Sequence, residues 1–339
     1  MEKESKAFLK SLLSACGPSG FEENIQAVWI KRTKKFADDI KKDVHGNAVA
    51  ALNPGKDLKL MLAGHCDEIG FIVTYISNEG FLYIDPIGGI DAGVVPGTQV
   101  KVMAASGLID GVIGKKAIHM LDAQERKKLI TLKDVYIDIG AKDKKDALKS
   151  VKIGDAAVVA PNFLELKNNT FSSKGCDDRT GAFVVSEVLK ILHHNKTKLK
   201  VSVYSVSTVQ EEVGLRGAVT SAYHVSPQAA MAVDVGHATD TPGVDKKVEG
   251  ETFLGKGPIL HKGPVITPGL VQVLIDTAHK KKIPYQMKGL NRPSGTDTGV
   301  IQLSRSGVAT ALIAVPNRYM HTPVEMCSYD DLTHCASLI

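Results

Sequence analysis

Neither a long apolar run nor a pair of closely spaced cysteines occurs in this chain of 339 residues. No stretch of 18 apolar residues is present, which excludes the usual membrane-spanning helix. The five cysteines are odd in number and form no CxxC pair, so we expect neither a disulfide framework nor a thiolate zinc site. The first residues, MEKESKAFLKSLL, lack the apolar core of a signal peptide. These absences together favour a reducing, cytoplasmic location.

Charge gives little indication of a polyanionic partner. The net charge is +5, and the basic runs at 31–36 and 279–282 carry no interleaved aromatic residues. Such runs are typical of solvated helix faces, so we expect no nucleic-acid binding. The glycines occur in no P-loop or GxGxxG context, which makes a nucleotide site improbable.

The pattern of predicted secondary structure changes twice along the chain. Helical and strand-like segments alternate before residue 70 and after residue 164, as in α/β domains. Between these points, short β-rich pieces such as GFIVTYI and TQVKVMAA are separated by Gly, Pro and Asp turns, which is typical of a small barrel or sandwich. We therefore predict one mostly parallel α/β domain, residues 1–69 and 165–339, interrupted by an inserted all-β domain, residues 70–164. Three consecutive domains are the alternative.

Local patterns predict some helix boundaries. Ser19 followed three residues later by Glu22 suggests a capping box before a second helix. Asp177 and Asp178 come directly before an apolar helical pattern, where one aspartate can cap the helix and the other is free for another task. The GTDTG segment at 295–299 is predicted either to cap a helix or to line a substrate pocket.

Residues suited to metal binding follow several apolar strands. His65 and Asp67 lie two positions apart at the end of one predicted strand, so their side chains share a face. Other imidazole and carboxylate groups follow later apolar segments: Asp177, the adjacent Glu211 and Glu212, Asp234 and His321. Because ligands gather beyond the carboxyl ends of strands in open α/β sheets, we expect these groups to meet.

This set fits two divalent metal ions. Zinc accepts imidazole nitrogen and carboxylate oxygen, and a bridging carboxylate is the usual link between two close metals. One glutamate of the adjacent pair would bind metal, and its neighbour would serve as general base. The metals would relieve the repulsion between the two glutamates.

Six ordered segments resemble the M42 family of metallo-aminopeptidases: GHCDEIGF, GCDDRTGA, QEEVGLRGA, AVDVGHATDTPG, GTDTGVIQ and RYMHTPVE. The resemblance implies a three-layer α/β/α catalytic domain with an inserted β domain that drives dimerisation. It also implies two metals, most often zinc or cobalt, with manganese as a further candidate. His65 and Asp234 would hold one metal, and Glu212 and His321 the other.

The resemblance also implies roles for the remaining site residues. Asp177 would bridge the metals, Glu211 would be the general base, and Asp67 would orient His65. A strained peptide is expected between Asp177 and Asp178.

The implied activity is removal of N-terminal residues from peptides that have a free amine. The family also implies self-association into a dimer and a twelve-subunit tetrahedron. A related dinuclear zinc carboxypeptidase or N-acyl amino acid deacylase is the alternative, since it would share the metals but select a different substrate group. A metal-independent glycosidase and a catalytically inactive scaffold are weaker alternatives.

Overall fold

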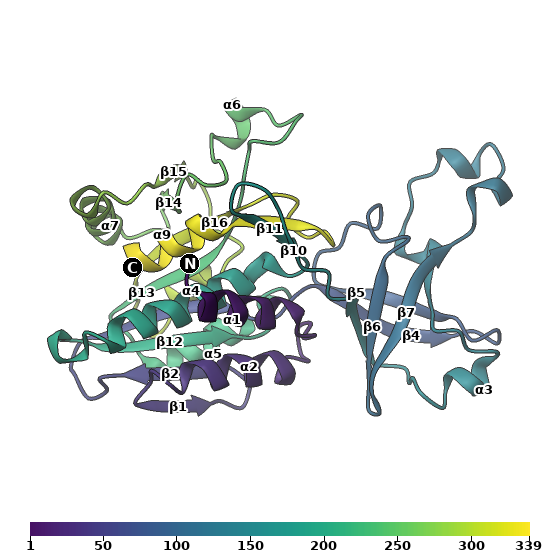
Figure 1. The fold of residues 1–339 in the computed structure, drawn as a ribbon, viewed down its shortest axis with the longest axis horizontal. Coiled ribbons are helices and arrows are strands. Elements are labelled where there is room, and N and C mark those ends of the chain that lie inside the picture. Colours follow the sequence, from purple (N-terminus) through teal and green to yellow (C-terminus); the bar gives the residue numbers. More distant parts are fainter.

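The computed structural model describes residues 1–339, and an eight-stranded mixed sheet forms its larger part (Figure 1). The strand order is β1-β2-β12-β3-β13-β16-β14-β15, and the four central strands from β12 to β16 run parallel. The strands are β1 (Asp39–Lys42), β2 (Ala48–Leu52), β3 (Lys59–His65), β12 (Ser202–Thr208), β13 (Ala229–His237), β14 (Ile259–Lys262), β15 (Gln286–Gly289) and β16 (Ala309–Asn317). The central ones are the apolar runs that the sequence marks as buried strands.

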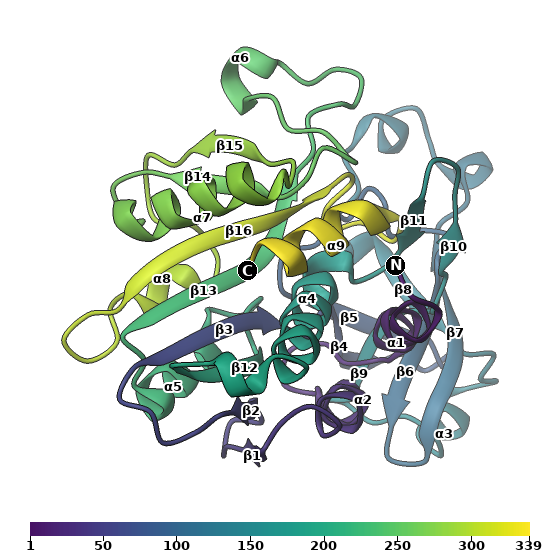
Figure 2. The same cartoon turned by 60° about the vertical axis from the view of Figure 1, so that its left-hand side comes forward.

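Helices cover both faces of this sheet and complete a three-layer arrangement. One face packs in the main apolar core against α1 (Lys3–Ser14), α2 (Glu23–Thr33), α4 (Cys176–His193), α7 (Pro268–Lys281) and α9 (Tyr329–Leu338), of which α4, α7 and α9 lie in front in Figure 2. The other face packs against α5 (Arg216–Val225) and α8 (Thr298–Ile301). Shorter helical turns are α3 (Lys144–Ala147), α6 (Lys246–Glu249), η1 (Ile118–Met120), η2 (Glu125–Lys127), η3 (Leu132–Asp134) and η4 (Lys196–Lys198). None of these helices combines the length and the apolarity that a membrane crossing requires.

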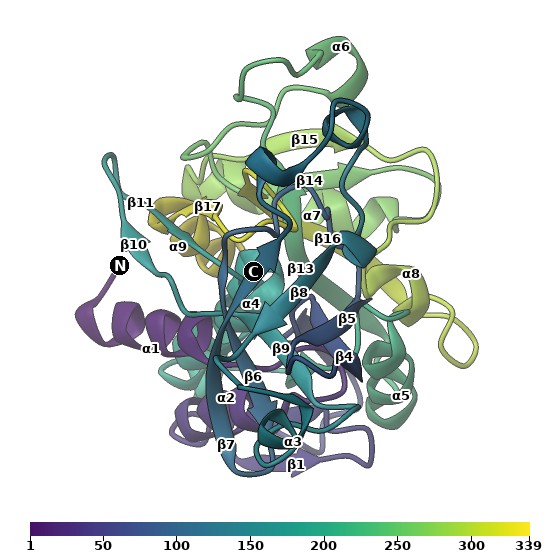
Figure 3. The same ribbon diagram turned by 90° about the vertical axis from the view of Figure 1, so that its right-hand side faces the viewer.

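A closed antiparallel barrel of six strands stands beside the sheet, with the order β4-β5-β8-β7-β6-β9 (Figure 3). Its strands are β4 (Gly70–Ile76), β5 (Leu82–Ile87), β6 (Gln99–Ala104), β7 (Gly107–Lys115), β8 (Val135–Asp138) and β9 (Ala156–Val159). The barrel has an apolar core of its own. Because β2 and β3 precede the barrel and pair with β12 and β13 that follow it, the barrel is an insertion, and the alternative of three consecutive domains is wrong. The proposed limits at residues 70 and 164 stay a prediction.

A small antiparallel sheet joins the barrel to the central sheet. It has the order β10-β11-β17, with β10 (Leu164–Glu165), β11 (Thr170–Ser173) and β17 (Glu325–Ser328). In its register, Ser173 pairs with Glu325. The chain segment that leads into α4 therefore lies beside a segment from near the C-terminus.

Two glycines let α4 approach the sheet closely. A Cβ on Gly64 of β3 would lie 2.5 Å from the backbone carbon of Gly181 in α4, and a Cβ on Gly181 would lie 2.6 Å from the backbone oxygen of Val233 in β13. No side chain fits between these backbones. The close contact brings the start of α4 next to the end of β3, where His65 lies.

The predicted capping box at Ser19 and Glu22 is wrong. The α2 helix begins at Glu23, and its N-cap residue Glu22 makes no side-chain cap bond. The hydroxyl of Ser19 instead donates to Oδ2 of Asp67 at 2.7 Å. A tertiary partner has thus replaced the local one that the sequence pattern suggested.

We predict that Gly64→Ala destabilises the protein by about 1–3 kcal/mol or more, because the added methyl group meets backbone atoms that cannot move aside. Urea denaturation monitored by the fluorescence of the single tryptophan, Trp29, measures this loss. Gly269→Ala in α7 is the control, since nothing lies within 4 Å of its added Cβ, and it should cost nothing. Equal stability of the two variants would contradict the packing argument.

Candidate metal centre

The candidate site lies at the carboxyl ends of the central parallel strands. His65 ends β3 and is paired in register with Thr208, the last residue of β12. The segment after β12 carries Glu211 and Glu212, and β13 carries Asp234 near its end. The sheet topology therefore brings these groups to one edge, as expected from the strand ends in the sequence.

Asp177 lies between two imidazole rings that come from opposite ends of the chain. Its Oδ1 is 3.2 Å from Nε2 of His65, and its Oδ2 is 3.2 Å from Nε2 of His321. Asp177 precedes the regular part of α4, and the peptide bond that joins it to Asp178 is cis. One carboxylate thus presents a separate oxygen to each imidazole.

The two adjacent glutamates point to different imidazoles. Oε2 of Glu211 is 3.7 Å from Nε2 of His65, whereas Oε1 of Glu212 is 3.3 Å from Nε2 of His321. Gln210 before them has a positive φ of 55°, so the chain turns sharply at this point. The glutamate pair is therefore divided between the two halves of the site.

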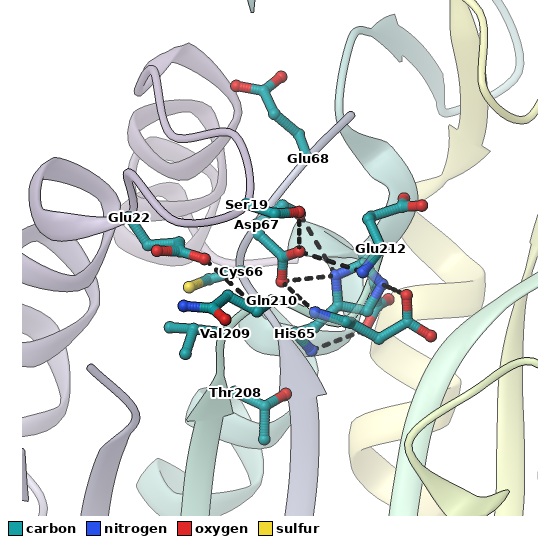
Figure 4. A network of polar contacts seen from close by, with 12 residues as sticks. Ser19, Glu22, His65, Cys66, Asp67, Glu68, Thr208, Val209, Gln210 and Glu212 are labelled. Atoms are coloured by element: carbon teal, nitrogen blue, oxygen red, sulfur yellow. Dashed lines mark hydrogen bonds and ion pairs between the residues drawn. The ribbon is translucent and has the colours of Figure 1, made fainter. Parts of the chain in front are cut away.

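Asp67 holds the segment that carries these glutamates (Figure 4). Its Oδ1 accepts the backbone N–H of Glu211 at 3.1 Å, and its Oδ2 accepts that of Glu212 at 3.2 Å. Its Oδ1 is also 3.4 Å from Nδ1 of His65. Asp67 therefore connects the imidazole of His65 to the turn that carries Glu211 and Glu212. Sequence reasoning had linked Asp67 to His65 alone.

Asp178 and Asp234 form a second group with His65. The ligand atoms of these three buried residues all lie within 4.8 Å of one another, and a second such set joins His65 to Asp177 and Glu212. Asp178 is already engaged, because its oxygens accept the backbone N–H groups of His65 at 3.2 Å and Gly181 at 2.9 Å. The two adjacent aspartates therefore have different partners: Asp178 accepts backbone amides, and Asp177 is directed at the imidazoles.

Asp297, from the GTDTG segment, also lies near the site without capping a helix by its side chain. It occupies the N-cap position of α8 and makes no cap bond; its Oδ2 instead accepts from the hydroxyl of Thr208 at 2.6 Å. Burial, with a contribution from Asp67, raises the pKa of Asp297 to about 6. Asp297 therefore adds one more acidic group near the carboxyl ends of the central strands.

The crowding of buried acidic groups shifts the pKa values of several site residues. Burial, with the nearby carboxylates of Asp234 and Asp297, raises the pKa of Glu211 to about 10. Hydrogen bonds with Asp177 and Glu212 raise the pKa of His321 to about 11. Burial alone would lower the pKa of His65, but the surrounding carboxylates raise it well above its usual value.

These groups fit divalent metal ions. Five carboxylates (Asp177, Asp178, Glu211, Glu212, Asp234) surround only two imidazoles, and burying so many like charges is costly unless positive charge compensates them. Imidazole nitrogen and carboxylate oxygen are ligands that zinc, cobalt and manganese accept. Bound cations would also keep Glu211 ionised near neutral pH.

Sequence reasoning missed a buried ion cluster behind the site. Both carboxylate oxygens of Glu68 accept from Nζ of Lys174, at 2.5 and 2.7 Å, and Oε1 also accepts from Arg179 at 2.8 Å. Arg179 further donates to the backbone oxygen of Cys66 at 3.2 Å. The cluster thus ties the segment after β3 to the start of α4. The only sequence signal was the position of Glu68 and Arg179 within motifs that already contained predicted ligands.

Comparison with known proteins identifies the class. The model of the M42 glutamyl aminopeptidase family matches residues 46–338. Lysyl aminopeptidase of Pyrococcus furiosus is 33% identical over 333 residues, which cover 97% of this chain and 94% of that protein. The chain therefore belongs to the M42 family of aminopeptidases, which are peptide-bond hydrolases.

Solved structures agree with this assignment. The crystal structure of TET aminopeptidase from the marine sediment archaeon Thaumarchaeota archaeon SCGC AB-539-E09 superposes with a TM-score of 0.95 at 35% identity, covering 99% of this chain and 94% of that one. The TET1 peptidase of Pyrococcus horikoshii, which can assemble into a tetrahedron or a large octahedral shell, gives a TM-score of 0.86 at 34% identity, covering 98% of this chain and 97% of that one. The predicted fold class, an α/β/α domain with an inserted barrel, is confirmed.

We predict that Glu68→Gln destabilises the protein by about 3–5 kcal/mol, because two buried cations lose their shared carboxylate. Urea denaturation of the metal-free protein measures this loss. Glu4→Gln is the control, since Glu4 pairs with Arg32 and Lys35 through a side chain that is 57% exposed, and solvent screens such pairs. A loss for Glu68→Gln no larger than that of the control would contradict a structural role for the cluster.

Proposed function

We propose that this protein removes single residues from the free N-terminus of peptides at a centre of two divalent metal ions. His65 and Asp234 would hold one ion, Glu212 and His321 the other, and Asp177 would bridge them. The observation that best supports this proposal is the placement of Asp177, with one oxygen 3.2 Å from each imidazole. Zinc is the ion that this donor set suits best, with cobalt and manganese as alternatives.

Bound divalent ions would supply a Lewis acid for the scissile carbonyl and would lower the pKa of a coordinated water. Glu211 is proposed as the general base, because it lies at the edge of the ligand set and sequence resemblance assigns it no metal. It would take a proton from the attacking water and return it to the departing amine. Asp67 would keep His65 in the orientation that presents Nε2 to the centre, since its carboxylate lies beside Nδ1.

The charge around the site favours a substrate amine over a substrate carboxylate. The site edge is rich in buried acids, which attract a protonated N-terminus. A carboxypeptidase requires a cationic side chain for the terminal carboxylate, and Lys174, which lines the pocket together with Asp177, Glu212 and His321, is already bonded to Glu68. This argument favours the aminopeptidase over the related carboxypeptidase or deacylase.

We also propose that the protein self-associates through its inserted barrel, as a dimer and then as a tetrahedral shell of twelve subunits. The related TET1 peptidase that assembles into a tetrahedron aligns with 98% of this chain. A hollow shell would restrict access to short or unfolded peptides.

We predict that Glu211→Gln lowers kcat by about 10²–10⁴-fold, because the proposed proton acceptor is lost. Metal content, measured by plasma mass spectrometry, should stay at the wild-type value in this variant. Glu212→Gln is the contrasting variant and should lose metal, since it removes a proposed ligand. Near-wild-type turnover by Glu211→Gln would show that another group is the base.

We predict hydrolysis of aminoacyl-p-nitroanilides but not of their N-acetylated forms, since acetylation removes the proposed recognition group. Treatment with EDTA should abolish the activity, and added zinc, cobalt or manganese should restore it. Release of acetate from N-acetyl amino acids, without release of p-nitroaniline from the free aminoacyl substrates, would instead support the deacylase. Glycosidase activity that survives EDTA would support a metal-independent mechanism.

A further inference from the structure

We propose that Glu325 is a positioning residue that fixes the distance between Asp177 and His321 without binding metal itself. Its two carboxylate oxygens accept two different backbone amides: Oε2 accepts the N–H of Asp177 at 3.1 Å, and Oε1 accepts the N–H of His321 at 2.9 Å. The proposal rests on the proposed function, because it concerns the two residues that would hold one of the metals.

The small sheet explains why Glu325 can reach both amides. It begins β17, and its register partner on β11 is Ser173, four residues before Asp177. His321 lies four residues before Glu325 on the other side. A side chain at this register position is therefore the natural link between the start of α4 and the loop that carries His321.

Each of the two segments needs such a link. His321 has a positive φ of 60°, a conformation that costs non-glycine residues free energy and that surrounding contacts must offset. Asp177 has non-helical backbone angles at the N-terminal end of α4, so its N–H has no helical partner. The carboxyl group of Glu325 satisfies both amides, and the residue is only 2% exposed.

An acidic side chain is an unfavourable choice at this buried position unless both of its oxygens have partners. The residue sits beside Asp177, and burial of a second carboxylate next to a first is unfavourable. A neutral side chain of similar size would avoid that repulsion but offers only one acceptor oxygen. The two amides bond to two different oxygens, and a carboxyl group presents both, whereas glutamine would place an NH₂ group against one of the amides.

The test compares two isosteric variants in metal-free protein titrated with zinc alone. Glu325→Gln leaves one of the two amides facing an NH₂ group. Asp331→Asn is the matched control. Asp331 lies in α9 and is equally buried, and its two oxygens accept the backbone N–H groups of Gly255 and Gly257, each at 2.7 Å. Both variants lose a comparable pair of hydrogen bonds.

We expect wild type and Asp331→Asn to bind two zinc ions per chain. Glu325→Gln should keep one and bind the second about 10–100-fold more weakly, as is typical when a residue that supports a ligand is altered. Hydrogen exchange of the Asp177 and His321 amides in metal-free protein should accelerate only in Glu325→Gln. Two ions bound with wild-type affinity, together with unchanged exchange, would overturn the inference.

Glu325→Asp serves if Glu325→Gln does not fold. It keeps the carboxyl group, but its shorter side chain cannot reach both amides. We therefore expect a loss of affinity for the second zinc that is smaller than in Glu325→Gln. Wild-type affinity would again overturn the inference. Failure of the wild-type protein to bind zinc, cobalt or manganese would overturn the proposed function and the inference together. Two ions bound tightly in both wild type and Glu325→Gln, with unchanged exchange of the two amides, would overturn the inference alone.

Discussion

The contact of one carboxylate with two imidazoles is the constraint on which the rest of the site depends. Asp177 reaches His65 and His321 with separate oxygens, and these residues lie 112 and 144 positions away in the sequence. Such a contact requires the end of β3, the start of α4 and the loop before β17 to be held within a few ångströms of one another. The close contact at Gly64 and Gly181 holds the end of β3 against the start of α4. The small sheet holds the start of α4 next to the loop before β17.

Buried carboxylates hold backbone amides around this centre. Asp67 accepts the amides of Glu211 and Glu212, and Glu325 accepts those of Asp177 and His321. Each of these carboxyl groups meets two backbone amides with two separate oxygens, so each holds its pair of backbone positions in place.

Much of this arrangement could be predicted from the sequence. What could not be predicted depends on contacts between residues that are far apart in the chain. Apolar runs identified the central strands, and polar groups at their ends identified the candidate ligands, because both signals are local. Ser19 shows where local reasoning fails: its spacing from Glu22 fits a cap, yet the hydroxyl bonds to Asp67, 48 residues away. Glu325 ends the RYMHTPVE segment, but nothing in the sequence indicated its role, since its partners are main-chain amides, which every residue except proline possesses. The roles of the predicted ligands stay predictions.

The way the barrel joins the sheet has a consequence for folding. Its first strand, β4, pairs with its last, β9, so the chain enters and leaves the barrel at neighbouring positions. Once the barrel has closed, the strands β3 and β12 are separated by a much shorter effective tether than their sequence distance suggests, and the entropy lost in joining them is correspondingly smaller. An insertion of this kind can therefore divide two halves of an active site in the sequence without slowing their assembly, provided that the inserted part folds first.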